Sequence, residues 1–250
     1  MFDRREFLKT VGTLSLVTIA AQQKAFGLAY RGEGAQWAKD MRALSDKLID
    51  RRISAENWQT GVDKIYSQAD FAALLRSIDF AAVREGMTIK DDAGNWLSVF
   101  IAGLSQSGDV KQIYTKIVGL KGGRTVPPHG HENEVSVFLT LNGEFRLRQW
   151  DRRAVNKDSL DIVPVFDGRS LPGQWSSQSE EKTNIHWLTT ESEEAFFLSV
   201  RVAKIDGTQG GRTRIPVDPD GAEYLGRGVY RAAIMDNDAW WQKYGRKTGV

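Results

Sequence analysis

The sequence predicts a mainly β protein, an antiparallel barrel of the jelly-roll kind preceded by an α-helical segment. Apolar residues recur at helical spacing up to about residue 86, and from residue 95 onward they form short runs typical of strands. Turn-forming sequences such as Asn142-Gly143 separate most of these runs. Regular short strands joined by tight turns are typical of closed antiparallel barrels and jelly rolls.

Residues 1–27 resemble a twin-arginine signal peptide. The pair Arg4-Arg5 is followed by a mildly apolar run over residues 10–21, and residues 25–27 have the small-x-small pattern of a cleavage site. The apolar run is shorter than the roughly 20 residues that span a bilayer as a helix. We therefore expect periplasmic localisation through the twin-arginine export machinery, with membrane attachment only if the signal stays uncleaved.

Composition excludes several classes of function. The chain of 250 residues contains no cysteine, which excludes disulfides, thiolate ligands and a thiol nucleophile. Its formal net charge is +2, and removal of residues 1–27, with four basic and two acidic side chains, brings that charge to 0. A domain of this charge lacks the basic footprint that nucleic-acid binding requires, so nucleic acid is not expected as a partner.

Residues 28–90 are expected to form the helical N-terminal segment. Apolar side chains recur at helical spacing over residues 37–48 and again over 58–66. Asp70 stands where an N-cap would begin a third helix at Phe71. The apolar stripes of these helices predict surfaces that face a core.

Residues 91–205 are expected to form the barrel. Its predicted strands are the apolar runs over residues 96–102, 112–120, 135–141, 144–150, 162–166, 184–190 and 195–202. Arg146 and Arg148 alternate with apolar residues on one of them, so they occupy one strand face. Facing inward they would bind a substrate carboxylate, but a solvated outer face is the favoured interpretation.

The strand that follows His131 has two different faces. One face is mixed and is expected to line a cavity: Glu134, Ser136, Phe138 and Thr140. The other face is wholly apolar: Val135, Val137, Leu139 and Leu141. An apolar face of this size is not left in water, so the N-terminal helices or a second subunit of a homo-oligomer must cover it.

Residues 206–250 are expected to form a C-terminal extension. It begins as a loop-rich tail near Gly207 and ends in a helical stretch that contains Trp240, Trp241 and Tyr244. Docking of these aromatic side chains onto the barrel is the favoured interpretation, with a subunit interface as the alternative.

The chain has three histidines, and their positions suit a single metal site. His129 and His131 are separated by one residue, which places both rings on the same face of an extended segment. His186 lies on another predicted strand. Neutral imidazole is the commonest metal ligand in proteins. We therefore predict one metal ion bound by all three side chains.

Further residues stand at characteristic distances from the histidines. Two glycines flank the His-x-His pair, and a threonine follows the third histidine by four residues: Gly123, His129, His131, Gly143, His186 and Thr190. Over about residues 95–205 these positions resemble the two cupin motifs, although that family usually has Asn at the Thr190 position. The resemblance implies a jelly-roll barrel with a mononuclear divalent transition metal, iron first, with Mn, Ni, Cu or Zn as alternatives.

Glu134 is the candidate fourth ligand. The family's glutamate position holds Ser136, and Glu134 lies two residues earlier on the same strand face. A bulge between His131 and Val137 would bring this carboxylate toward the metal. We expect Glu134 to act as a ligand, or through water as a general base.

The resemblance implies a metal-dependent oxidoreductase, of the dioxygenase type, acting on a small organic substrate. Helices before the barrel and a serine at the glutamate position are also similar to the thiol dioxygenase branch, but no fourth histidine exists for that branch's Ser-His-Tyr relay. The alternative is a non-catalytic metal- or ligand-binding module, for instance a subunit of a cell-envelope complex. A metal-free isomerase-type protein is the third hypothesis.

Overall fold

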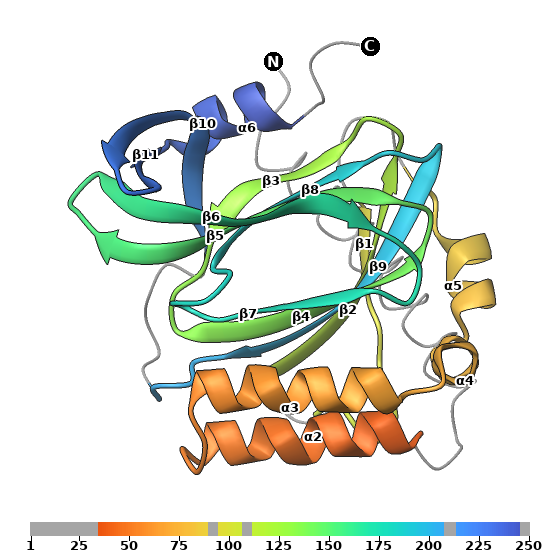
Figure 1. Cartoon of the computed structure of the whole chain (residues 1–250). Helices are drawn as coiled ribbons and strands as arrows, with labels where there is room; N and C mark the ends of the chain where they lie inside the picture. Colours follow the sequence, from red (N-terminus) through yellow and green to blue (C-terminus); the bar gives the residue numbers. More distant parts are fainter. Residues whose placement is uncertain (1–34, 90–94, 107–111, 208–213, 246–250) are drawn as a thin grey trace, which may run out of the picture.

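The computed structural model describes residues 35–89, 95–106, 112–207 and 214–245. Within these ranges, four helices precede a set of antiparallel strands and one helix follows it (Figure 1). The helices are α2 (Gln36–Ile49), α3 (Ala55–Gln68), α4 (Phe71–Ser77), α5 (Phe80–Gly86) and α6 (Asn237–Tyr244). None of the described helices is long and apolar enough to cross a membrane. The predicted signal peptide lies outside the described residues.

Eleven described strands form two sheets that face each other. One sheet has five strands in the order β1-β2-β9-β4-β7, and the other has six in the order β10-β11-β6-β5-β8-β3 and closes through pairing of β10 with β3. The strands are β1 (Asn95–Ser98), β2 (Ile113–Lys121), β3 (Thr125–Gly130), β4 (Glu134–Asn142), β5 (Phe145–Val155), β6 (Ser159–Ser170), β7 (Trp175–Gln178), β8 (Ile185–Thr190), β9 (Glu194–Ala203), β10 (Ile215–Gly226) and β11 (Val229–Ile234). The predicted mainly β antiparallel barrel behind a helical segment is confirmed.

The N-terminal helices cover the outer face of the five-stranded sheet. Figure 1 shows α2 and α3 side by side beneath β4, β7 and β2. The apolar face of β4 belongs to the same buried cluster as Trp37, Met41 and Trp58 from these helices. Asp70 caps α4 as predicted, because its side chain accepts a hydrogen bond from the Ala73 amide. The helices thus provide the cover that the apolar face of β4 requires.

Two further apolar clusters lie on the other side of this sheet and beyond it. One fills part of the space between the two sheets and includes Val118, Phe138 and Phe197. The other packs α6 against the six-stranded sheet and includes Trp240 and Tyr244. The five-stranded sheet therefore has a helix-covered face and a face that looks into the barrel.

The C-terminal extension was expected to begin as a loop-rich tail, but it contains β10 and β11. These two strands complete the six-stranded sheet. Two prolines and two glycines interrupt β10, and its register with β11 shifts between Asp218 and Glu223. These interruptions remove the alternation that identifies a strand. Strand β3 was not predicted for the same reason, because it contains Pro127 and Pro128, which lie at a register shift against β8.

Candidate metal centre

The three histidines meet where β3 pairs with β8 in the six-stranded sheet. His129 on β3 and His186 on β8 are direct cross-strand partners, and His131 lies just after β3. Their ring centroids are 4.3 to 5.3 Å apart, and one ligand nitrogen from each lies within 4.8 Å of the others. Among the described residues, these three histidines are the one cluster of His, Asp or Glu side chains that could hold a metal ion.

Each imidazole has its Nδ1 next to an oxygen. Nδ1 of His129 lies 2.7 Å from the Pro127 carbonyl oxygen, and Nδ1 of His186 lies 3.1 Å from that of Asn184. A carbonyl oxygen only accepts hydrogen bonds, so Nδ1 carries the hydrogen in both rings and the lone pair is on Nε2. Metal-binding histidines are commonly oriented in this way.

Burial keeps two of these rings neutral. The pKa of His186 is lowered to about 3, first by burial and then by the neighbouring imidazole of His131. The pKa of His129 is held well below its usual value by burial, followed by the repulsion of His186 and His131. Both side chains are therefore uncharged at neutral pH, which is the form that binds a metal.

Glu134 lies beside His131. Its side chain is 1% exposed, and Oε1 is 2.8 Å from Nδ1 of His131. Its Oε2 is 3.4 Å from a guanidinium nitrogen of Arg201. The carboxylate thus contacts the ring nitrogen that would not bind the metal, an arrangement that favours orientation of His131 over direct ligation. A role as ligand or general base stays a prediction.

The bulge expected between His131 and Val137 is absent, because β4 pairs with β9 in unbroken register from Glu134 to Thr140. The turn before β4 brings Glu134 to the site instead, and it includes Asn133 in the left-handed conformation at φ 56°. A turn residue with positive φ reverses the chain without adding a residue to the strand.

Asn184 holds the turn that carries His131. Its amide Nδ2 donates to the carbonyl oxygens of His131 and Ser179, each at 2.8 Å. A Cβ atom on Gly130, the residue between His129 and His131, would clash with Oδ1 of Asn184, so the absence of a side chain there lets Asn184 approach closely. Neither Gly130 nor Asn184 could be singled out from the sequence pattern.

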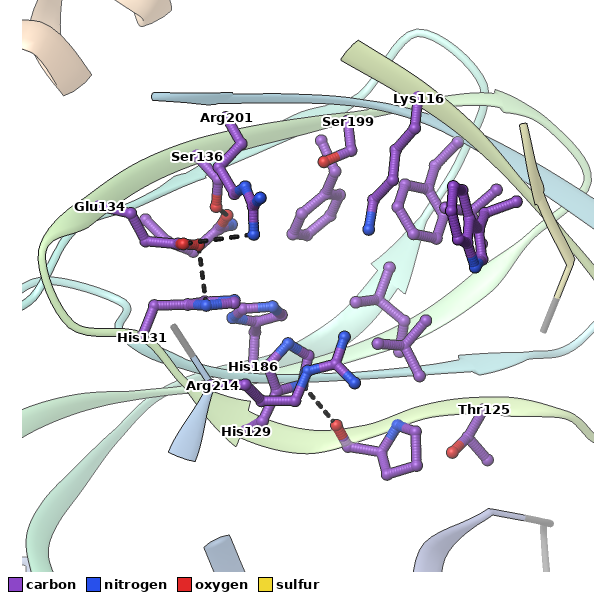
Figure 2. A pocket seen from close by; sticks show the side chains of 18 of the residues that line it. Lys116, Thr125, His129, His131, Glu134, Ser136, His186, Ser199, Arg201 and Arg214 are labelled. Atoms are coloured by element: carbon purple, nitrogen blue, oxygen red, sulfur yellow. Dashed lines mark hydrogen bonds and ion pairs between the residues drawn. The ribbon is translucent and has the colours of Figure 1, made fainter. Parts of the chain in front are cut away.

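The histidines face a cavity of about 800 Å³ between the two sheets. Its apolar wall includes Val118, Leu188 and Phe197, and Asn237 and Trp241 of α6 also line it. Figure 2 shows His129, His131 and His186 on one side, with Glu134, Ser136 and Arg201 opposite. The mixed face of β4 lines this cavity, as its alternation predicted.

Three basic side chains enter the same cavity: Lys116 from β2, Arg201 from β9 and Arg214 just before β10. The sequence interpretation missed all three. A signal existed for two, because Lys116 and Arg201 are single charges within the apolar runs QIYTKIVGL and AFFLSVRV. The arginines that it did consider face outward: Arg146 pairs with Asp167, and Arg148 stacks on Trp187.

No protein-family model matches this chain, and neither does any curated protein. Solved structures resemble about half of it. A Klebsiella pneumoniae protein with a double-stranded β-helix domain is 12% identical, with a TM-score of 0.36, over 49% of this chain and 82% of that one. Procruciferin, an 11S globulin of Brassica napus, is 16% identical, with a TM-score of 0.34, over 47% of this chain and 27% of that one.

An oxalate oxidase structure is 15% identical, with a TM-score of 0.34, over 48% of this chain and 55% of that one. The matched region thus spans about a quarter of the globulin and about half of the oxidase. At these identities and TM-scores the likeness carries no information about activity.

The donor set fits a divalent transition metal. Three imidazole nitrogens converge, and two of them belong to buried, neutral rings whose tautomer is set by backbone carbonyls. Nitrogen ligands of this kind suit Fe, Zn, Cu and Ni, whereas Ca²⁺ and Mg²⁺ prefer oxygen ligands. The cavity beside the histidines leaves room for a small molecule next to such an ion.

Proposed function

We propose that this chain is an exported, cupin-type metalloenzyme, a metal-dependent oxidoreductase of the dioxygenase type. His129, His131 and His186 would hold one divalent transition metal through their Nε2 atoms, with iron as the first expectation. One observation carries the proposal: the three imidazoles converge at a cavity, with Nδ1 of each ring next to an oxygen acceptor.

A bound iron ion would supply Lewis acidity and redox chemistry with dioxygen. The protein residues supply position and environment. Glu134 orients the His131 ring and pairs with the guanidinium group of Arg201. Val118, Leu188 and Phe197 give the cavity an apolar wall, against which the carbon skeleton of an organic substrate can lie.

Metal content tests the first half of the proposal. Protein purified from its native compartment should contain about one transition-metal ion per chain by elemental analysis. His131→Ala and His186→Ala should each remove most of it and abolish the rise in melting temperature on metal addition, since a metal bound only by the folded state stabilises that state. Ser136→Ala, which alters the cavity wall without removing an imidazole, is the matched control.

Full metal occupancy in the double variant His131→Ala/His186→Ala would contradict the site. Oxygen consumption tests the second half. Iron-loaded protein should consume dioxygen when supplied with its organic substrate, and His186→Ala should not. Metal binding without oxygen consumption across a broad panel of small organic molecules would favour the alternative, a non-catalytic binding module.

A further inference from the structure

The charge of the cavity is unbalanced. Lys116, Arg201 and Arg214 contribute three cations, while Glu134 is the one acidic side chain among the described residues that line it. Of these cations only Arg201 has a salt bridge within the described part of the chain, and its partner is Glu134. Occupation of the histidines by a divalent ion would add further positive charge.

These cations approach from both sheets. Lys116 and Arg201 extend from β2 and β9 of the five-stranded sheet, and Arg214 extends from the segment before β10, on the histidine side. Figure 2 shows the ends of Lys116, Arg201 and Arg214 directed into the space beside the imidazoles. A ligand in that space would meet basic groups on two sides.

The basic groups also repel one another. The pKa of Lys116 is lowered to about 8 by burial and then by the charges of Arg201 and Arg214. The pKa of Arg214 is lowered by burial and then by Arg201. A bound anion would relieve this repulsion, so the cavity is prepared for negative charge.

We propose that the substrate is a small organic carboxylate, with its carboxylate held by Lys116, Arg201 and Arg214 and its apolar body against Val118, Leu188 and Phe197. The inference rests on the proposed function, since the bound carboxylate is what the metal centre would act on. Guanidinium groups bind carboxylates through paired N–H donors. The three cations outnumber Glu134 by two charges, so a bound carboxylate reduces the excess of positive charge in the cavity.

Matched pairs of probes test this inference. Phenylacetate and hexanoate are compared with phenylacetamide and hexanamide, which have the same shape without the charge, by calorimetric titration of the metal-free and the zinc-loaded protein. Each carboxylate should bind at least tenfold more tightly than its amide in both forms.

Substitutions locate the binding groups. Lys116→Met and Arg214→Gln should each weaken carboxylate binding by about three- to tenfold and leave amide binding unchanged, in line with the worth of a partly exposed charge-assisted hydrogen bond. Lys157→Met is the control, because it removes the same charge from an exposed turn outside the cavity. Unchanged melting temperatures would show that the variants fold.

Equal affinity for carboxylates and amides would overturn the inference. Carboxylate binding confined to the zinc-loaded protein and insensitive to Lys116→Met would also overturn it, because the metal alone would then hold the anion. Selective carboxylate binding by a protein that takes up no metal would support the anion site and refute the proposed metal centre. The anion site and the metal centre can therefore be refuted independently of each other.

Discussion

The three imidazoles of the site are held by chemically different acceptors. Backbone carbonyls orient His129 and His186, so no single side-chain substitution removes their support. His131 instead depends on the carboxylate of Glu134. The charge around the proposed metal can therefore be changed at this one contact while the three histidines stay intact.

Glu134→Gln is expected to retain most of the bound metal. The amide oxygen can still lie next to Nδ1 of His131, but the negative charge is lost, so metal affinity should fall by about tenfold, as is typical for the partner of a ligand histidine. Competition with a chelator measures that affinity. A loss as complete as in His131→Ala would show that Glu134 itself is a ligand.

The buried histidines should make the metal-free protein sensitive to acid. In the unfolded chain a histidine titrates near pH 6.5, whereas the pKa of His186 in the folded protein is about 3. Between these values the unfolded state binds more protons, so the free energy of unfolding falls as pH falls. One such group gives a slope of about 1.4 kcal/mol per pH unit.

Denaturant unfolding of metal-free protein between pH 7 and pH 4 checks this expectation. His186→Gln, which cannot titrate, should lose stability less steeply over that range. Parallel pH curves for the two proteins would contradict the assignment of a buried neutral imidazole at this position.

Helix α6 supports β3, the strand that carries His129. Nε1 of Trp240 donates to the Pro128 carbonyl oxygen at 2.7 Å, and its ring packs edge-on against His129. Trp240 is 4% exposed, whereas the neighbouring Trp241 is 41% exposed. The two tryptophans thus form a natural pair of test and control.

Trp240→Phe should lower the free energy of unfolding by about 1–3 kcal/mol, because it leaves a buried carbonyl without its donor and removes ring volume. Trp241→Phe should change it by less than about 0.5 kcal/mol, as expected at an exposed position. Equal effects of the two substitutions in urea unfolding would show that α6 does not brace β3.

Periodicity predicted the elements whose faces differ clearly. Helices α2 and α3, the Asp70 cap, and strands β4, β5, β8 and β9 all follow from apolar spacing. Periodicity did not reveal β3 and β10, since proline and glycine interrupt them, nor β7, which has four residues of which three are polar. Long-range pairing, rather than local preference, makes these segments strands.

The residues of the site likewise fall into those that the sequence pattern reveals and those that it does not. The histidines could be chosen from the sequence because they are few and regularly spaced, and the structure brings them together. Lys116, Arg201 and Arg214 could not be grouped, because two strands and the segment before a third deliver them to one cavity. Their meeting is a property of strand order, which the alternation pattern does not contain.

Export is a property of the whole chain. The pair Arg4-Arg5 and the short apolar run after it predict passage through the twin-arginine route, which carries folded proteins. Replacing both arginines with lysine should leave the precursor inside the cell, at nearly unchanged charge. Cell fractionation and immunoblotting measure this. Normal delivery of the variant to the periplasm would refute twin-arginine export.

The two faces of the five-stranded sheet also determine which sequence changes the protein can tolerate. Along β9, Phe197, Ser199 and Arg201 face the cavity, while Leu198 and Val200 pack under the helices. Substitutions at alternate positions can thus retune ligand selectivity without disturbing the helix layer. Losing one residue from this strand would instead exchange the two faces. Ligand selectivity can therefore diverge by point substitution, whereas insertions and deletions in the central strands should be removed by selection because they disrupt the fold.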